Sequence, residues 1–381
     1  MSGFSYLRYF FLTVAVILAP VIAINYIADP AGIYHYGKSW DWIKSRPSLD
    51  EMMYIHKAHA VATARADILL LGTSRVANGL DPSCPALPYP AYNLGLHGGQ
   101  VYESWRYFQH AAAAHVPRMA VLGVDRMMFS ADKPVWPSFT EERLSVQPDG
   151  RPNSFYRWAD ILPTLLSFHA FAVSLNSLLT RTRSPIVYTR GYEADDPAII
   201  EHFDLAAYVL KESRRSLGEG PPHSLYNPDG TSLQMDAYDH LISWCAAHHV
   251  RLIVFVLPLH ASKLDTLTVD WNDYSEWMRI MLNKLDAQPG LDWEFWDFAG
   301  YNSMSTEPLP APTDTVSHMK YYWEASHFRK NVGDLVLTRL FKGTGPNGFG
   351  YRLTPATVDQ DLARLKAEKD AWHAHGTVSS P

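Results

Sequence analysis

The chain contains a serine, a histidine and a carboxylate in positions that suit acyl-transfer chemistry. The stretch ADILLLGTSRVANGLDP, residues 66–82, is an apolar run that breaks at Gly72, and Ser74 follows two residues later. Near the other end of the chain, Glu324 stands three residues before His327. A serine nucleophile needs a base to take its proton, and a histidine base needs a carboxylate to fix its tautomer. We therefore predict that Ser74, His327 and Glu324 are catalytic residues.

Other polar residues and glycines follow the predicted strands, where the carboxyl ends of parallel strands form ligand sites. The candidates for binding an oxyanion or a substrate are Gly95, Gly99, Asn93, Asp125, Arg75, Arg126 and His260. Backbone amides of glycines are suitable donors to the oxyanion of a tetrahedral intermediate. Structural roles remain open for these residues: a tight turn for Asn93 and Gly95, ion pairs with Asp125 for the two arginines, and the wall of a cleft for His260.

The sequence offers no set of residues with the spacing of a metal site. Its two cysteines, Cys84 and Cys245, lie far apart, and no His-Glu-x-x-His stretch occurs. We expect neither a metal ion nor a cofactor. The cysteines are compatible with one disulfide in an oxidising compartment or with two buried thiols.

Short apolar runs alternate with helical stretches, which is the pattern of a parallel sheet with helices on its faces. We expect strands at 66–72, 89–96, 118–125, 250–258 and 292–299, and helices at 48–64, 98–115, 155–180, 235–249, 274–285, 327–341 and 355–373. The pattern loosens in the middle of the chain. The predicted organisation is an α/β domain at 48–343 with a helical or irregular insertion at about 126–234, then a charged, solvated helical tail at 344–381.

The composition supports a large folded core and argues against a nucleic-acid partner. Of 381 residues, 47% are hydrophobic and 13% are aromatic, which is enough to bury a sizeable core. The formal net charge is −6, and no run of lysine and arginine occurs. Proteins that bind nucleic acids normally present a basic face.

The amino terminus carries an uncharged stretch of twenty residues at 9–28. That length crosses the apolar core of a bilayer at 1.5 Å per residue, and Arg8 before it favours a cytoplasmic amino terminus. A cleaved signal peptide would have a shorter apolar region and an A-x-A-like site, and a buried helix is the other alternative. We predict that residues 1–30 form an uncleaved single-pass anchor in the inner (cytoplasmic) membrane, with the bulk of the chain periplasmic or otherwise extracytoplasmic.

The order of these motifs resembles that of the SGNH, or GDSL-like, hydrolase superfamily. The first block of that superfamily is Gly-Asp-Ser, and Gly72-Thr73-Ser74 is similar to it. Its second block centres on a glycine, which would be Gly95 or, alternatively, Gly99. Its last block is Asp-x-x-His, and Glu324-Ala325-Ser326-His327 has the same spacing.

Three positions depart from the superfamily pattern. Thr73 replaces the aspartate of the first block, and Glu324 is one methylene longer than the aspartate of the last. Asp125 stands where the third block has an asparagine that donates to the oxyanion. Because an ionised carboxylate cannot donate a hydrogen bond, Asp125 is protonated, has another role, or leaves the oxyanion to backbone amides alone.

The resemblance covers roughly residues 60–135 and 245–341. With the apolar amino terminus and the sequence SHFRKNVGDLVL, the chain looks most like the membrane-anchored branch, which includes alginate and peptidoglycan O-acetyltransferase-like proteins and the partner of lipoteichoic-acid D-alanylation. The resemblance implies a three-layer α/β/α sandwich with a mainly parallel sheet.

The same resemblance implies a function at the cell envelope. We expect a serine-dependent acyltransferase, most simply an acetyltransferase, or an esterase that acts on a glycan or another hydroxyl acceptor, with a membrane-bound O-acyltransferase as a partner. A second interpretation stays open. In it, the chain is a catalytically inactive SGNH-like partner of such an acyltransferase, or an accessory protein that binds polysaccharide.

Overall fold

The chain folds into two compact units. The computed structural model describes residues 3–34, 52–179, 186–195, 211, 213–215, 217–219, 222–310 and 319–374. The first unit comprises Met1–Ala64, Pro137–Val187 and Ala194–Glu201, and the second comprises Arg65–Trp136, Tyr188–Glu193 and His202–Pro381. We call them the N-terminal unit and the α/β unit.

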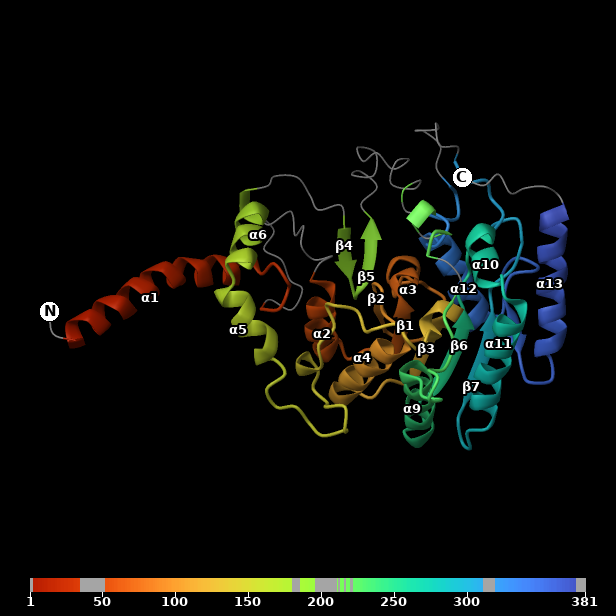
Figure 1. Cartoon of the computed structure of the whole chain (residues 1–381), viewed down its shortest axis with the longest axis horizontal. Helices are drawn as coiled ribbons and strands as arrows, with labels where there is room; N and C mark the ends of the chain where they lie inside the picture. Colours follow the sequence, from red (N-terminus) through yellow and green to blue (C-terminus); the bar gives the residue numbers. More distant parts are fainter. Residues whose placement is uncertain are drawn as a thin grey trace. The chain divides into compact units, whose positions relative to one another are not determined.

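Helices make up most of the regular structure described in the N-terminal unit, which also contains the ends of two short strands. Its helices are α1 (Gly3–Ala28), α2 (Met53–Ala64), the short helix η2 (Glu141–Arg143), α5 (Trp158–Leu166) and α6 (Phe168–Leu179). Helix α1 is long and apolar enough to span a membrane. It contacts α5 and α6 (Figure 1), so the anchor and part of the insertion, which we predicted as separate parts of the chain, belong to one unit.

The single helix that we expected at 155–180 is a bent pair. Helices α5 and α6 meet at 72° around Ser167. At the break, the Ser167 amide donates to the Thr164 carbonyl at 3.4 Å, and the Ser167 hydroxyl accepts a hydrogen bond from the Ala170 amide at 3.1 Å in the first turn of α6. The expected helix at 48–64 begins at Met53, and residues 48–51 lie outside the described part of the chain.

The α/β unit is built on a six-stranded, mostly parallel sheet (Figure 1). Its strands are β1 (Ile68–Thr73), β2 (Ala91–Leu96), β3 (Met119–Val124), β6 (Arg251–Val256), β7 (Trp293–Asp297) and β8 (Tyr351–Leu353), in the spatial order β2-β1-β3-β6-β7-β8. The first five are parallel, as predicted, and β8 is antiparallel. A separate two-stranded sheet consists of β4 (Ile186–Thr189) and β5 (Tyr192–Asp195).

The helices of the α/β unit follow the predicted pattern with three additions, one of which is the short helix η1. They are α3 (Ser74–Gly79), the short helix η1 (Arg126–Phe129), α4 (Val101–Ala114), α9 (Leu233–Ala247), α10 (Ala261–Leu267), α11 (Trp271–Asp286), α12 (Lys330–Lys342) and α13 (Val358–Ala374). We did not predict α3 and α10, which have only six and seven residues. Helix α12 starts three residues later than expected, so His327 lies in the loop before it.

The solvated tail predicted at 344–381 is wrong for the described residues to Ala374. Strand β8 pairs with β7 and closes one edge of the sheet. Helix α13 buries Val358, Leu362 and Leu365, and Arg364 lies 3.4 Å from the buried carboxylate of Asp297. These apolar residues fall on one face of a highly charged helix, which is why the composition of the segment suggested a solvated helix.

The strand order places a topological switch beside β1. The chain passes from β1 to β2 on one side and then returns to β3 on the other side of β1. Open parallel sheets bind ligands outside the carboxyl ends of their strands at such a point. Ser74 directly follows β1, and Asp125 directly follows β3, so both residues lie at this edge.

Candidate active site

A tight turn from strand to helix presents Ser74. Strand β1 ends at Thr73. The Thr73 hydroxyl accepts a hydrogen bond of 3.3 Å from the Arg75 amide and thereby caps α3. Gly72 has a φ of +145°, and a Cβ there would lie 2.7 Å from the carbonyl oxygen of Gly123, so only glycine fits. The Ser74 amide lies in the first turn of α3, where no carbonyl of the same helix faces it.

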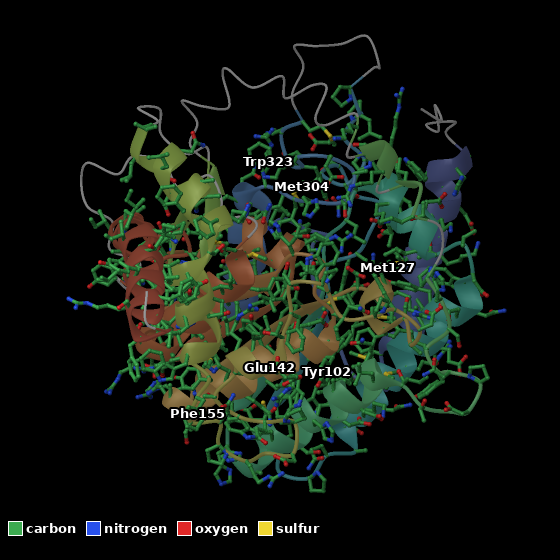
Figure 2. All side chains as sticks on the ribbon, turned by 60° about the vertical axis from the view of Figure 1, so that its left-hand side comes forward. Tyr102, Met127, Glu142, Phe155, Met304 and Trp323 are labelled. Atoms are coloured by element: carbon green, nitrogen blue, oxygen red, sulfur yellow. The ribbon has the colours of Figure 1, made fainter. Side chains whose placement is uncertain are left out.

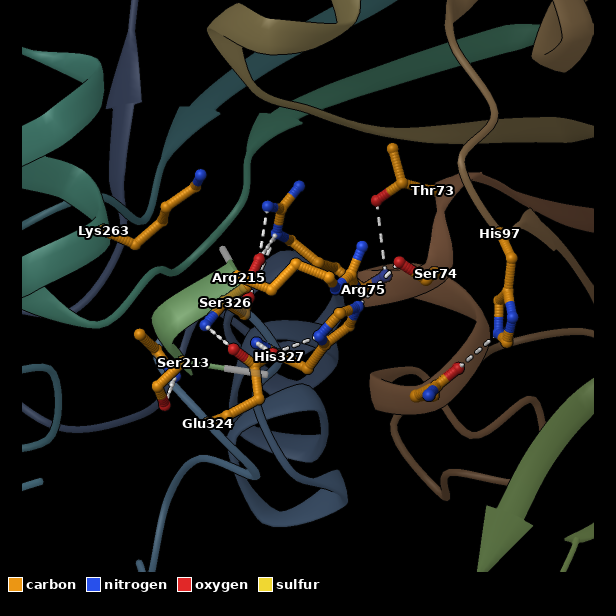
Figure 3. Close-up of polar contacts among 12 residues, drawn as sticks. Thr73, Ser74, Arg75, His97, Ser213, Arg215, Lys263, Glu324, Ser326 and His327 are labelled. Atoms are coloured by element: carbon orange, nitrogen blue, oxygen red, sulfur yellow. Dashed lines mark hydrogen bonds and ion pairs between the residues drawn. The ribbon is translucent and has the colours of Figure 1, made fainter. Parts of the chain in front are cut away.

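The structure brings Ser74, His327 and Glu324 together (Figure 3). The Oγ of Ser74 lies 2.7 Å from Nε2 of His327, although the two residues are 253 positions apart. The other ring nitrogen of His327, Nδ1, is hydrogen-bonded to the Glu324 carboxylate. Glu324 is buried, whereas the His327 side chain is about one-fifth exposed. This arrangement can pass a proton from the serine to the imidazole while the carboxylate holds the ring.

The Glu324 carboxylate is held in its ionised form. It accepts the backbone amides of Ser326 and His327, both at 2.8 Å. Burial alone would raise the pKa of Glu324, but His327, the Ser326 amide and the charge of Arg75 together lower it. An ionised carboxylate stabilises the imidazolium that forms when His327 takes a proton.

Replacing Glu324 with glutamine is expected to change how stability depends on pH. Because the folded-state pKa of Glu324 lies below its usual value of 4.5, ionisation stabilises the fold above that pH. This contribution is lost as the pH falls through the folded-state pKa. The free energy of unfolding, measured with urea from neutral to acidic pH, should therefore fall less steeply in Glu324→Gln than in the wild type. Asp286→Asn, at an exposed carboxylate, should keep the wild-type slope, and equal slopes in all three proteins would contradict the assignment.

Arg75 joins the serine turn to the loop that carries the histidine. Its Nε donates to the carbonyl oxygen and to Oγ of Ser326, both at 3.0 Å. Its Nη1 forms an ion pair with the Asp125 carboxylate, and both residues are buried. Asp125 also accepts the amides of Met127 at 2.8 Å and Met128 at 3.3 Å. The predicted place of Asp125 in an oxyanion site is therefore corrected, because its carboxylate is the partner of Arg75 and of these amides.

The backbone amides of the two glycines predicted as oxyanion donors already have hydrogen-bond acceptors within the protein. The amide of Gly95 donates to Oδ1 of Asn93 at 2.9 Å, and the amide of Gly99 donates to the carbonyl of Leu96 at 3.0 Å. A Cβ at Gly95 would lie 2.3 Å from the backbone nitrogen of Ala77, so this glycine allows α3 to approach β2. These contacts give both glycines a structural role.

Asn93 is a structural residue as well. Its side-chain amide donates to the carbonyl oxygens of Val76 at 2.7 Å and Leu80 at 2.8 Å, and the residue is fully buried. It therefore fixes α3 against β2 and offers no donor to a substrate.

Arg126 and His260 are bonded outside the serine cluster. Arg126 makes two hydrogen bonds of 2.7 Å with Asp273, so the ion pair with Asp125 that we left open does not form. Nε2 of His260 bonds the carbonyl of Glu307 at 2.7 Å, and Nδ1 accepts the Ser262 amide at the start of α10. Burial lowers the pKa of His260, which favours the neutral ring that these two contacts require.

A second histidine–carboxylate pair lies near the same turn and was not predicted as part of the site. Nε2 of His97 lies 2.6 Å from the buried Glu193 carboxylate. Asn78 of α3, with its amide turned to suit its neighbours, donates to the Ser74 carbonyl and to Glu193, both at 3.0 Å. In Figure 3, His97 and His327 lie on opposite sides of Ser74. No sequence signal pointed to Glu193, because it comes from the irregular insertion.

The comparisons with known proteins leave the family of this chain open. The sequence matches no model of a known protein family and no curated protein.

Proposed function

We propose that this chain is an extracytoplasmic, serine-dependent acyltransferase or esterase of the SGNH type, held at the inner membrane by α1. The observation that carries the proposal is the continuous hydrogen-bonded chain from Ser74 through His327 to Glu324. The position of Ser74 at a topological switch, where open sheets bind ligands, also supports it.

The reaction follows from these three side chains. Nε2 of His327 accepts the hydroxyl proton of Ser74 while Oγ attacks the acyl carbonyl, and Glu324 stabilises the resulting imidazolium. The protonated ring then gives its proton to the leaving alcohol or thiol, which leaves an acyl ester on Ser74. A hydroxyl acceptor or water attacks this ester, and His327 takes the new proton and returns it to Oγ of Ser74.

The proposed acceptor is a hydroxyl group of a cell-envelope or secreted glycan, and the proposed acyl group is acetyl. Arg8 of α1 precedes the uncharged stretch of that helix, which favours an amino terminus in the cytoplasm and a site outside it. An acyl group used there has to be delivered across the membrane, which is the part that a membrane-bound O-acyltransferase partner would play.

A second candidate function is a non-catalytic partner of such an acyltransferase, or a polysaccharide-binding accessory protein. The observation that favours it concerns the oxyanion. Asp125 is paired with Arg75, and the amides of Gly95 and Gly99 already have acceptors. Of the amides of Ser74, Gly95 and Gly99, that of Ser74 at the start of α3 is left for a developing oxyanion, and loss of one donor costs about 10²–10³ in rate.

Covalent labelling separates the two candidates. A fluorophosphonate probe should modify Ser74 in the folded protein, because His327 activates the hydroxyl, and peptide mass spectrometry should locate the adduct there. His327→Ala should lose the labelling. His223→Ala, at an exposed histidine that pairs with Asp132 outside the cluster, should keep it.

Two results would overturn the enzymatic proposal. Folded wild-type protein that never labels at Ser74 would favour the non-catalytic partner. Labelling that survives in His327→Ala would show that the histidine does not activate the serine.

A further inference from the structure

The N-terminal unit carries an exposed apolar surface on α5 and α6. The name α5–α6 surface is used below for this set of exposed, large apolar side chains: Phe155, Trp158, Leu162, Leu166, Phe168, Leu175 and Leu179. Trp158, Leu162 and Leu166 lie one helical turn apart on α5. Phe155, just before α5, is 76% exposed and is labelled in Figure 2. Exposed apolar patches of this kind mark sites of contact with a protein or a membrane.

The opposite side of α6 carries small residues, two of which are polar. Its buried residues are Ala170, Ser174 and Ser177, and helix α1, which contacts α6, buries Val21, Asn25 and Ala28. The Ser174 hydroxyl donates to Oδ1 of Asn25 at 3.0 Å. Small residues and hydrogen bonds between side chains are the means by which helices associate inside membranes. The contact between α1 and α6 therefore has the character of a membrane helix pair.

Asn25 also satisfies the backbone where α5 and α6 break. Its side-chain amide lies 3.0 Å from the carbonyl oxygens of Thr164, Leu165 and Ser167. Unpaired backbone groups are costly in a bilayer, so non-helical backbone at membrane depth needs partners of this kind. The carbonyl groups at the bend therefore have hydrogen-bond partners within the protein, as a bend inside the bilayer requires.

We propose that the α5–α6 surface inserts into one leaflet of the bilayer that α1 spans and forms a second, non-spanning membrane contact. The proposal rests on the membrane anchor that is part of the proposed function. Because α5 and α6 contact α1 directly, we infer that lipid covers the α5–α6 surface. The two helices have nine and twelve residues. At 1.5 Å per residue, neither helix alone reaches across the apolar core of about 30 Å, and the pair, which is apolar enough together, is bent by 72° and does not form one straight span. Trp158 suits the headgroup level, where aromatic residues are enriched.

Environment-sensitive labelling tests the contact in the full chain reconstituted in lipid nanodiscs. Leu162→Cys and Leu175→Cys would each carry an NBD fluorophore, and Val269→Cys, at an apolar side chain of the α/β unit that is 66% exposed, is the matched control. The native thiols Cys84 and Cys245 are buried and unpaired, and burial raises the pKa of both. They should therefore resist the reagent, and the unsubstituted chain measures any background.

The expected result is NBD emission at shorter wavelength at Leu162 and Leu175, with quenching by spin-labelled lipids, and neither effect at Val269. Emission at both α5–α6 positions that matches Val269 would overturn the proposal. Short-wavelength emission without lipid quenching would also overturn it, because protein, such as a second copy, would then cover the surface. Leu166→Cys supplies a further position if one variant fails to fold. Fluorophosphonate labelling of Ser74 in the same nanodiscs tests the enzymatic proposal separately.

Discussion

Ser74→Ala is expected to reduce acyl transfer and ester hydrolysis to background, because no covalent acyl intermediate can form. Removal of the nucleophile from a serine–histidine–carboxylate site costs on the order of 10⁶ in kcat. Glu324→Gln should cost less, about 10²–10⁴, because His327 remains but loses the carboxylate that orients it. Both effects are measured as the rates of hydrolysis of a p-nitrophenyl ester and of acetyl transfer to a soluble glycan.

Ser83→Ala is the matched control for this prediction. Ser83 is an exposed serine in the turn that follows α3, and its replacement should leave both rates unchanged. Ser74→Ala should unfold at the same urea concentration as the wild type, so that its loss of activity reflects chemistry. Wild-type rates in Ser74→Ala would place the active group elsewhere.

Arg75→Met should be the most destabilising of the substitutions considered for the site. It keeps much of the volume of the side chain but leaves the buried Asp125 carboxylate without its guanidinium partner. Breaking a buried ion pair from one side costs about 3–5 kcal/mol. The substitution also removes the hydrogen bonds to Ser326, so fluorophosphonate labelling of Ser74 should slow even where the protein remains folded.

A double-mutant cycle and a surface control make this prediction specific. Arg75→Met with Asp125→Asn should be more stable than Arg75→Met alone, because the unpaired charge is gone. Arg118→Met removes an exposed arginine 3.6 Å from Asp67 and should cost about 0–1 kcal/mol. Urea unfolding is measured for five proteins: the wild type, Arg75→Met, Asp125→Asn, the double variant and Arg118→Met. If Arg75→Met cost no more than Arg118→Met, the ion pair would not hold the site together.

The sequence allowed prediction of the strands and of the cluster around Ser74, because both depend on residue types. Strands β1, β3 and β6 are almost entirely apolar, as a sheet covered on both faces requires. The chain has a serine directly after β1 and a histidine three residues after a carboxylate. Because these residue types form acyl-transfer sites, their chemistry suggested that Ser74, His327 and Glu324 meet. Strand β8 has only three residues, and α13 has few apolar residues among many charged ones. The charge of this segment therefore led to the wrong prediction of a solvated tail.

The hydrogen-bond partners of the remaining candidates could not be predicted. The carboxylate that pairs with Arg126 is Asp273 of α11, and the carbonyl that accepts from His260 belongs to Glu307. Such partners are set by how distant elements pack, and the local pattern around each residue does not encode them. The same holds for Asn93, whose bonds to α3 depend on how closely Gly95 lets that helix approach β2.

The distance along the chain between Ser74 and His327 sets an order of events during synthesis. The serine is made 253 residues before its hydrogen-bond partner. At about 5–20 residues per second, that interval lasts roughly 10–50 s. During it, Ser74 is an ordinary alcohol, because nothing is yet present to take its proton. A chain that is still being synthesised therefore has no histidine beside Ser74, and the cluster forms only when the loop before α12 has joined the sheet.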